Sequence, residues 1–201
     1  MTKTFLTPLS AAALLALAPL AHAATVIDTG TPNGQAVGSL VFDGSDWVAA
    51  QVNFADAATI ASIAGHVLGG TAGETFDISL YDGGATPGSQ LFTTTATYGA
   101  DGWNGASGLG WTVAPGNYWI EFEVNWNDTL GTTPTATGAL FDTGVAHPVQ
   151  TATTPDWGFT YDASAQSIGL QVSVVPEPTG ALQVLGGMLL LSTLGLARRR
   201  R

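Results

Sequence analysis

Two glutamates and a tryptophan alternate along one predicted strand, and they are the residues of this sequence best placed to do chemistry. Trp119, Glu121 and Glu123 fall on one side of a period-two pattern, so their side chains share one face of the strand. Glycoside hydrolysis uses two carboxylates about 5–10 Å apart, and an indole ring offers a flat apolar surface to a sugar. The same pattern also describes an ordinary strand face in water, and we expect all three side chains to be exposed to solvent.

Oxygen-rich turns are the candidates for a metal site. They lie at residues 43–46, 101–104 and 125–128. Calcium takes six or more oxygen ligands from carboxylates and carbonyls. None of the three segments has the spacing of an EF-hand, and Asp-Gly and Asn-x-Asp sequences also form simple turns. We therefore predict no resident cofactor, with calcium as the alternative.

Most catalytic constellations are missing from the sequence. It contains no cysteine, and its central segment has only two histidines, His66 and His147, far apart in the chain. A Gly-x-Ser-x-Gly nucleophile motif is also absent. We therefore predict a protein that is not an enzyme, with a secreted glycoside hydrolase using Glu121 and Glu123 as an alternative.

Positive charge is confined to the two ends of the chain. The five basic residues are Lys3 and the arginines at 198–201, so the segment 24–175 combines 14 acidic residues with no lysine or arginine. A segment without cations cannot neutralise phosphates, which excludes nucleic acid as a partner. An acidic surface does keep a secreted protein soluble.

The central segment alternates between apolar and polar residues, which is typical of half-buried strands. Four stripes are clear: Val48, Ala50, Val52 and Phe54; Phe76, Ile78 and Leu80, with Thr75, Asp77, Ser79 and Tyr81 on the opposite side; Tyr118, Ile120, Phe122 and Val124, opposite Trp119, Glu121 and Glu123; and Ile168, Leu170, Val172 and Val174.

Further strands are expected at 38–42, 59–68, 90–98, 138–141 and 157–161, separated by Gly-Gly, Pro-Gly and Asn-Gly turns at 69–70, 83–84, 87–88, 104–105 and 115–116. Residues 127–155 are rich in Thr and Pro and are predicted to form a long loop. Many short strands, each with one apolar face, predict an all-β fold built as an antiparallel two-sheet sandwich of the jelly-roll kind.

The N-terminal segment has the three parts of a secretory signal peptide. Lys3 supplies the positive charge, an apolar run covers 9–20, and Ala21-His22-Ala23 fits the small-x-small cleavage rule. Signal peptidase and the secretion translocon are the expected partners, and the mature chain is expected to begin at Ala24. This divides the sequence into a leader (1–23), a passenger domain (24–175) and a C-terminal tail (176–201).

The tail also has three parts. An extended motif opens it, an apolar stretch of 18 residues without charge follows at 180–197, and four arginines end it: Pro176, Glu177 and Pro178, then Arg198, Arg199, Arg200 and Arg201. A bilayer core of about 30 Å needs roughly 17–25 helical residues. The arginines are expected to stay on the cytoplasmic side of the membrane. The tail therefore predicts a transmembrane helix over 180–197 with the passenger outside.

This order of elements resembles the PEP-CTERM sorting signal of secreted bacterial proteins. Pro176, Glu177 and Pro178 match the motif and the four arginines match its basic end, whereas Thr179 stands where a small residue, often serine, is usual. The resemblance implies processing by an exosortase in a bacterium that makes exopolysaccharide. It also implies a protein that is anchored transiently in the inner membrane and then retained at the cell surface, in the outer membrane or in the extracellular matrix.

A second resemblance concerns the passenger. Residues 78–88 (Ile-Ser-Leu-Tyr-Asp-Gly-Gly-Ala-Thr-Pro-Gly), followed by 90–92 and then by 114–120 (Ala-Pro-Gly-Asn-Tyr-Trp-Ile), look like the "choice-of-anchor" domains of bacterial surface proteins. This implies a jelly-roll-like sandwich without catalytic residues. We therefore predict a non-enzymatic surface or matrix protein associated with exopolysaccharide. A carbohydrate-binding module, possibly assisted by calcium, is the alternative.

Overall fold

The computed structural model describes residues 23–32, 40–42, 47–125, 127–130, 139–141, 151–154, 162–164 and 168–175. All of them belong to one compact unit, Ala23–Pro176. Every regular element in the described residues is a strand, and no helix that could cross a membrane is found among them. The predicted leader, the sorting tail, the strand expected at 157–161, the oxygen-rich turn at 43–46 and His147 lie outside the described residues.

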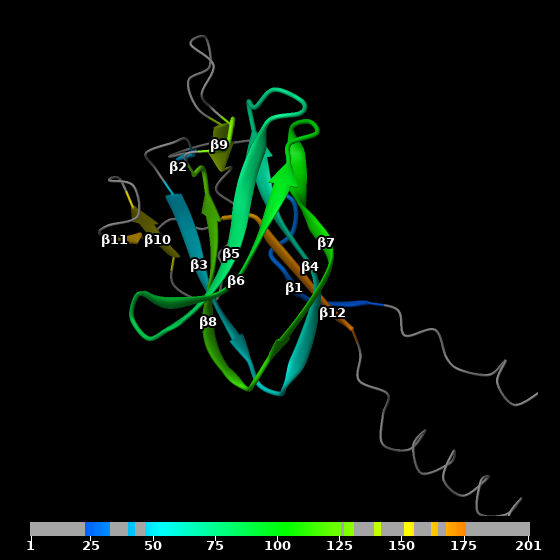
Figure 1. Cartoon of the computed structure of the whole chain (residues 1–201), viewed down its shortest axis with the longest axis vertical. Coiled ribbons are helices and arrows are strands. Elements are labelled where there is room, and N and C mark those ends of the chain that lie inside the picture. The colour runs from blue at the N-terminus through cyan, green and yellow to red at the C-terminus, as the bar shows by residue number, and fades with distance from the viewer. Residues whose placement is uncertain are drawn as a thin grey trace, which may run out of the picture. The chain divides into compact units, whose positions relative to one another are not determined.

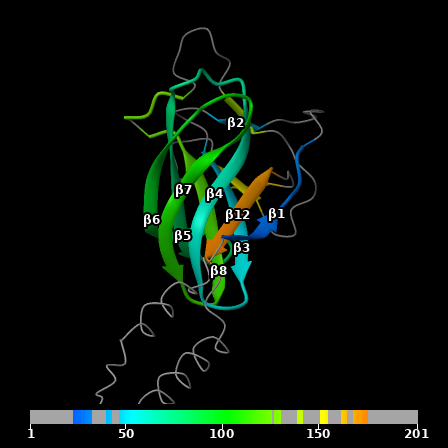
Figure 2. The same cartoon turned by 90° about the vertical axis from the view of Figure 1, so that its right-hand side faces the viewer.

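Twelve strands are found in the described residues: β1 (Ala24–Asp28), β2 (Leu40–Phe42), β3 (Trp47–Phe54), β4 (Ala58–Leu68), β5 (Thr75–Gly83), β6 (Pro87–Thr97), β7 (Gly102–Val113), β8 (Gly116–Glu123), β9 (Ala139–Phe141), β10 (Thr151–Thr154), β11 (Asp162–Ser164) and β12 (Leu170–Val175). They form two antiparallel sheets (Figures 1 and 2). Sheet A has the order β1-β12-β4-β9-β2, with β7 paired to the other side of β4, and sheet B has the order β11-β10-β3-β8-β5-β6. The all-β prediction is confirmed.

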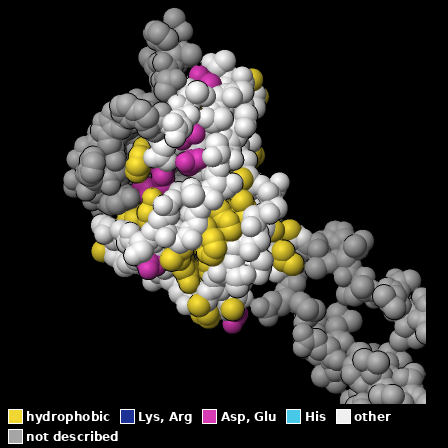
Figure 3. Space-filling view, viewed as in Figure 1, with side chains coloured by type: hydrophobic (Ala, Val, Ile, Leu, Met, Phe, Trp, Pro, Cys, Tyr) yellow, Lys and Arg dark blue, Asp and Glu magenta, His cyan; other side chains and the backbone are white. Residues whose placement is uncertain are grey.

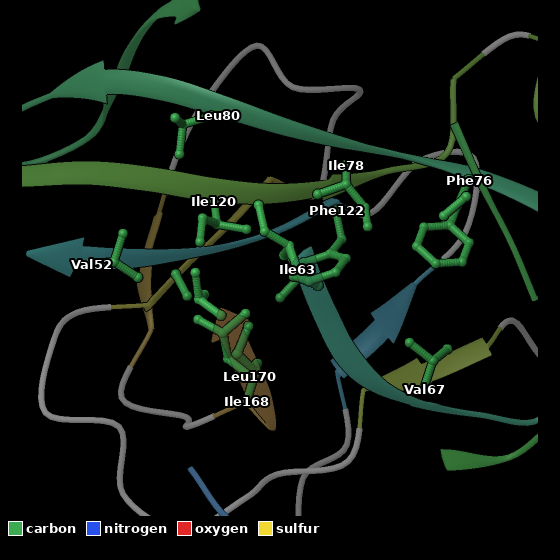
Figure 4. Close-up of a cluster of buried hydrophobic side chains, with 14 of the residues drawn as sticks. Val52, Ile63, Val67, Phe76, Ile78, Leu80, Ile120, Phe122, Ile168 and Leu170 are labelled. Atoms are coloured by element: carbon green, nitrogen blue, oxygen red, sulfur yellow. The ribbon is translucent and has the colours of Figure 1, made fainter. Parts of the chain in front are cut away.

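The predicted stripes meet between the two sheets. Ile78 and Phe122 of sheet B and Ile63 and Leu170 of sheet A are fully buried in one apolar cluster (Figure 4). Aromatic rings fix one part of it, since the centroids of Phe76 and Phe122 lie 6.4 Å apart. Burial of apolar surface at about 25 cal/mol per Å² makes this cluster the main favourable term of the fold. Each of the four stripes predicted from the sequence faces it.

Strand β7 was not expected from the sequence, and its glycines explain why. Four glycines between 102 and 110 give a turn-like composition, and a turn was predicted at Asn104-Gly105. Gly105 instead pairs with Ala64 of β4, at a point where an added Cβ atom would lie 2.0 Å from the carbonyl oxygen of Ile63. The glycine therefore marks a close approach of two backbones within a sheet.

Three further expectations are corrected. The turn at Pro87-Gly88 is wrong, because both residues begin β6 and Gly88 is not among the described glycines with positive φ. The single long loop over 127–155 is also wrong, since the whole of β10 falls in it and pairs with β3, while β9 in the same range matches the strand expected at 138–141. Strands β1, β10 and β11 were not predicted. All three are short, and β1 and β11 lie at sheet edges, where period-two patterning is weak.

Strands β1 and β12 bring the two ends of the described domain together. They pair antiparallel at the edge of sheet A, with Ala24 opposite Val174. Val175 in turn pairs with Thr59 at the start of β4. The residue after the predicted leader cleavage and the residue before the sorting motif thus lie beside the same end of the sandwich, where residues 55–57 connect β3 to β4.

Candidate functional site

The side chains singled out for chemistry lie on the outer face of sheet B, away from the apolar core. Strand pairing places them in three rows that cross β6, β5 and β8. Thr95, Asp77 and Glu123 form the first row, Thr93, Ser79 and Glu121 the second, and Gln90, Tyr81 and Trp119 the third. The structure therefore joins the predicted trio to polar residues of two neighbouring strands. We call these nine residues, with Asn125, the polar face.

The trio is buried, which corrects the expectation that it faces solvent. The exposed fractions of Trp119, Glu121 and Glu123 are 1%, 0% and 3%. Trp119 packs with Ala49 and Tyr81 in a second, small apolar cluster. The alternation of apolar and polar residues assigns side chains to the two faces of a strand. It does not show whether the polar face is exposed to solvent or buried under other segments. A tryptophan so deeply buried cannot offer its ring to a sugar in this structure.

Glu123 is held by two neutral donors. The Tyr81 hydroxyl donates to Glu123 Oε1 at 2.9 Å, and Asn125 Nδ2 donates to Glu123 Oε2 at 3.0 Å. Asn125 Nδ2 also donates to Asp77 Oδ2 at 3.0 Å, so one amide bridges two carboxylates. Asp77 receives a further bond on Oδ1 from the Thr95 hydroxyl at 2.8 Å. Hydrogen bonds to ionised acceptors are stronger than neutral ones, which makes this network a firm connection between β5, β6 and β8.

Hydrogen bonds also link the other two rows to each other and to the β5–β6 turn. Ser79 Oγ donates to Thr93 Oγ1 at 3.0 Å and accepts from Gln90 Nε2 at 3.0 Å. The carbonyl of Gly84 accepts from Gln51 Nε2 at 2.6 Å and from Trp119 Nε1 at 3.3 Å. The β5–β6 turn is thereby tied to strands β3 and β8. Such bonds are expected wherever polar side chains are buried.

The geometry of the polar face favours structural carboxylates over a catalytic pair or a metal centre. A buried charge is costly unless it is paired or hydrogen-bonded, and the segment 24–175 has no lysine or arginine to pair with it. The amide of Asn125 occupies the position between Asp77 and Glu123 that a bridging cation would need. Within the described ranges, no group of three or more His, Asp or Glu side chains is arranged to hold a metal ion.

The two other oxygen-rich turns within the described residues are also internally satisfied. Asp101 Oδ1 accepts from the Gly69 amide and from the Tyr98 hydroxyl, both at 2.6 Å. The Tyr98 bond, followed by that from Gly69, lowers the pKa of Asp101, whereas burial and the partner carboxylate raise the pKa of Tyr98 to about 12. Asn104 caps the same turn through bonds to Gly99, Ala100 and Gly102.

The second of these turns, at 125–128, lies beside the polar face. The backbone N–H of Asn125 donates to Asp128 Oδ2 at 2.8 Å, and the backbone N–H of Asp128 donates to the Asn125 carbonyl at 2.9 Å, so the two residues close the turn. Burial and then the neighbouring charge of Asp77 raise the pKa of the Asp128 carboxyl. Both segments thus use their oxygen atoms to build turns, as the alternative explanation from the sequence proposed.

His66 is part of the packing of sheet A. It is 8% exposed, lies opposite Trp103 in the β4–β7 pairing, and its ring meets the indole edge-to-face with centroids 5.2 Å apart. No aromatic side chain is among the exposed large hydrophobic residues of the described ranges, which are Val26, Leu91 and Val175. The exposed ring platform on which a carbohydrate-binding module would rely is therefore not found there.

Sequence reasoning identified part of the polar face and missed the rest. Asp77, Ser79 and Tyr81 were visible as the polar side of the stripe in β5, but only the pairing of β5 with β8 places them beside the glutamates. Asn125 follows the end of β8 and gave no signal of its own, since asparagine is common in turns.

Comparison with known proteins adds no relative: no family model, no curated protein and no solved structure matches this chain. The resemblances of the tail and of the passenger stay predictions, and the physical description of the polar face stands on the structure alone.

Proposed function

We propose that this chain is an exported, non-enzymatic surface or matrix protein that an exosortase processes at its C-terminal tail and that associates with exopolysaccharide. The passenger is an acidic sandwich whose carboxylates serve its own fold. The proposal joins the tail motif at 176–178 to the internally bonded polar face.

The observation that carries the proposal is the pairing of Ala24 with Val174. All described strands lie between Ala24 and Val175, so cleavage after Ala23 and cleavage within 176–178 remove no strand of the domain. Both predicted processing sites are also next to the same sheet edge, within reach of membrane-bound enzymes. A domain with this arrangement survives the loss of both ends.

We further propose that the sandwich is of the jelly-roll kind. Neighbouring strands in each sheet are far apart in sequence, as with β3 beside β8 and β12 beside β4. Such crossovers between two sheets are the connections that a jelly roll requires.

Truncation after Val175 tests the sorting function. This boundary keeps the pairing of Val175 with Thr59, so the passenger retains all of β12. In a host with an exosortase, we expect the truncated chain to be released into the medium and the full chain to be retained at the surface. The full chain in the same host without exosortase is the matched control. An identical distribution of the full and truncated chains would contradict the proposal.

A further inference from the structure

One end of the sandwich carries a shallow apolar hollow. It has a volume of about 300 Å³ and lies where the β3–β4 turn meets strands β1 and β12. Its lining includes Val26, Ile27, Phe54, Ala57 and Val174, with Asp56 as its one charged residue. We call this hollow, together with residues 55–57 and Val175, the tail-proximal end.

Large apolar side chains are exposed at this end. Val26 is 50% exposed and Val175 is 38% exposed, and only Leu91 joins them among the described residues. Val26 is the extra residue of a bulge in β1, since Thr25 pairs with Ser173 and Ile27 with Val172. Exposed apolar side chains around a hollow mark a surface that can bind a membrane or another apolar surface.

The sequence holds this end close to the predicted membrane span. Only four residues, 176–179, separate Val175 from the apolar stretch that begins at Gly180. Five steps of at most about 3.4 Å each give a reach of about 17 Å. The headgroup layer takes up roughly 5–8 Å of that distance. If 180–197 spans the bilayer, the tail-proximal end therefore lies within about 10 Å of the headgroup surface.

Asp56 and Asp82 lie toward the tail-proximal end, but a larger group of acidic side chains lies toward the other end. Glu74, Asp77, Asp101, Glu123 and Asp128 lie near the turns at 69–74 and 98–101 or at the end of β8. On the face shown in Figure 3, acidic side chains gather in the upper half, and hydrophobic side chains gather below them. A membrane surface with negative charge repels the acid-rich end of such a domain more strongly than the tail-proximal end.

We propose that the tail-proximal end rests on the lipid surface in which the chain's own tail is anchored, with Val26, Val175 and the β3–β4 turn in the headgroup layer. This contact rests on the proposed function, because it requires the tail to span the membrane. It fixes the orientation of the passenger before processing, with the acid-rich end pointing away from the bilayer.

Two exposed alanines at opposite ends of β4 provide a matched test. Ala57 lies in the turn before β4 and Ala72 in the turn after it, and β4 has 11 residues, about 36 Å of strand. The sequence has no cysteine, so Ala57→Cys and Ala72→Cys each give a single labelling site. The full chain is placed in phosphatidylcholine nanodiscs whose lipids carry a headgroup quencher, with a fluorophore on the cysteine. Ala55→Cys repeats the measurement at a second position of the same turn.

We expect the probe at position 57 to be quenched several-fold more strongly than the probe at position 72. Equal quenching at the two positions, in a chain that floats with the lipid, overturns the contact and leaves the proposed function standing. A chain that does not float with lipid overturns both. If the probes at position 57 quench each other, and only in discs that hold two chains, the surface binds a second copy of the chain. That result also overturns the proposed contact with lipid.

Discussion

The two faces of strand β8 are both buried but differ in what holds them. Ile120 and Phe122 point into the space between the sheets and belong to its apolar cluster. Glu121 and Glu123 point to the outer face, where Tyr81 and Asn125 donate to the carboxylate of Glu123. The inner face gains stability from apolar area, and the outer face depends on how well each carboxylate is satisfied.

The outer face shows how a domain without lysine or arginine can bury acidic side chains. Ion pairs with lysine or arginine are not available between 24 and 175, so neutral hydroxyl and amide groups take the place of these cations. The same device recurs at the other polar turn, where the Tyr98 hydroxyl donates to Asp101. Tyrosine suits this role because its ring packs against apolar neighbours while its hydroxyl reaches a polar atom.

The largest effect is expected from a truncation on the inner face. Phe122→Ala removes a fully buried ring that packs against Phe76. We expect a loss of about 3–5 kcal/mol in the free energy of unfolding, from lost transfer energy and the remaining cavity. Urea denaturation of the passenger measures it. A loss as small as that of an exposed-site variant such as Leu91→Ala would mean that the core between the sheets is wrongly assigned.

A smaller loss is expected from the outer face. Glu123→Ala leaves the Tyr81 hydroxyl and the Asn125 amide without their common acceptor, at an expected cost of about 1–3 kcal/mol. Glu123→Gln keeps one acceptor oxygen and is the matched control, with a smaller loss. A gain in stability for Glu123→Ala would contradict a structural role, because residues kept for function often lower stability.

The hydrogen bond between the Tyr98 hydroxyl and the Asp101 carboxylate also predicts a loss of stability at alkaline pH. The pKa of Tyr98 rises from 10.0 to about 12 on folding, so its contribution is complete below pH 10 and is lost as the pH rises through about 12. The urea midpoint of the wild type should fall across this window. Tyr98→Phe should have a lower midpoint at neutral pH and a shallower fall. Parallel curves for the two proteins would show that this pair does not contribute.

The smallest effect is expected at Asp128, and it has the opposite sign. Burial and the charge of Asp77 raise the pKa of this carboxyl above its usual value, so the destabilisation begins as the pH rises through the usual value and is complete above the folded pKa. Asp128→Asn keeps an oxygen for the Asn125 amide and should raise the urea midpoint slightly at neutral pH. No gain is expected well below pH 3.8, the usual pKa of this carboxyl, because it is then protonated in both the folded and the unfolded wild type. A lower midpoint at neutral pH would contradict this explanation.

Strands in which apolar and polar residues alternate regularly could be predicted from the sequence. Whether the polar face of such a strand is buried or exposed to solvent could not. In β8 the pattern correctly assigns Tyr118, Ile120, Phe122 and Val124 to the core. It cannot tell whether Glu121 is in water or covered, because that depends on segments distant in the chain. Strand β7 fails for another reason, since Gly105 serves a backbone contact with Ile63 rather than a turn. Local composition cannot separate these two uses of glycine.

The central claim is that the chain is exported and processed at both ends around an intact sandwich. The most direct test is the intact mass of the protein isolated from the envelope of a host that has an exosortase. We predict a chain that begins at Ala24 and ends within 176–180, directly after β12. A mass that still includes residues 181–201, or that places the C-terminus before Val175, would contradict the claim.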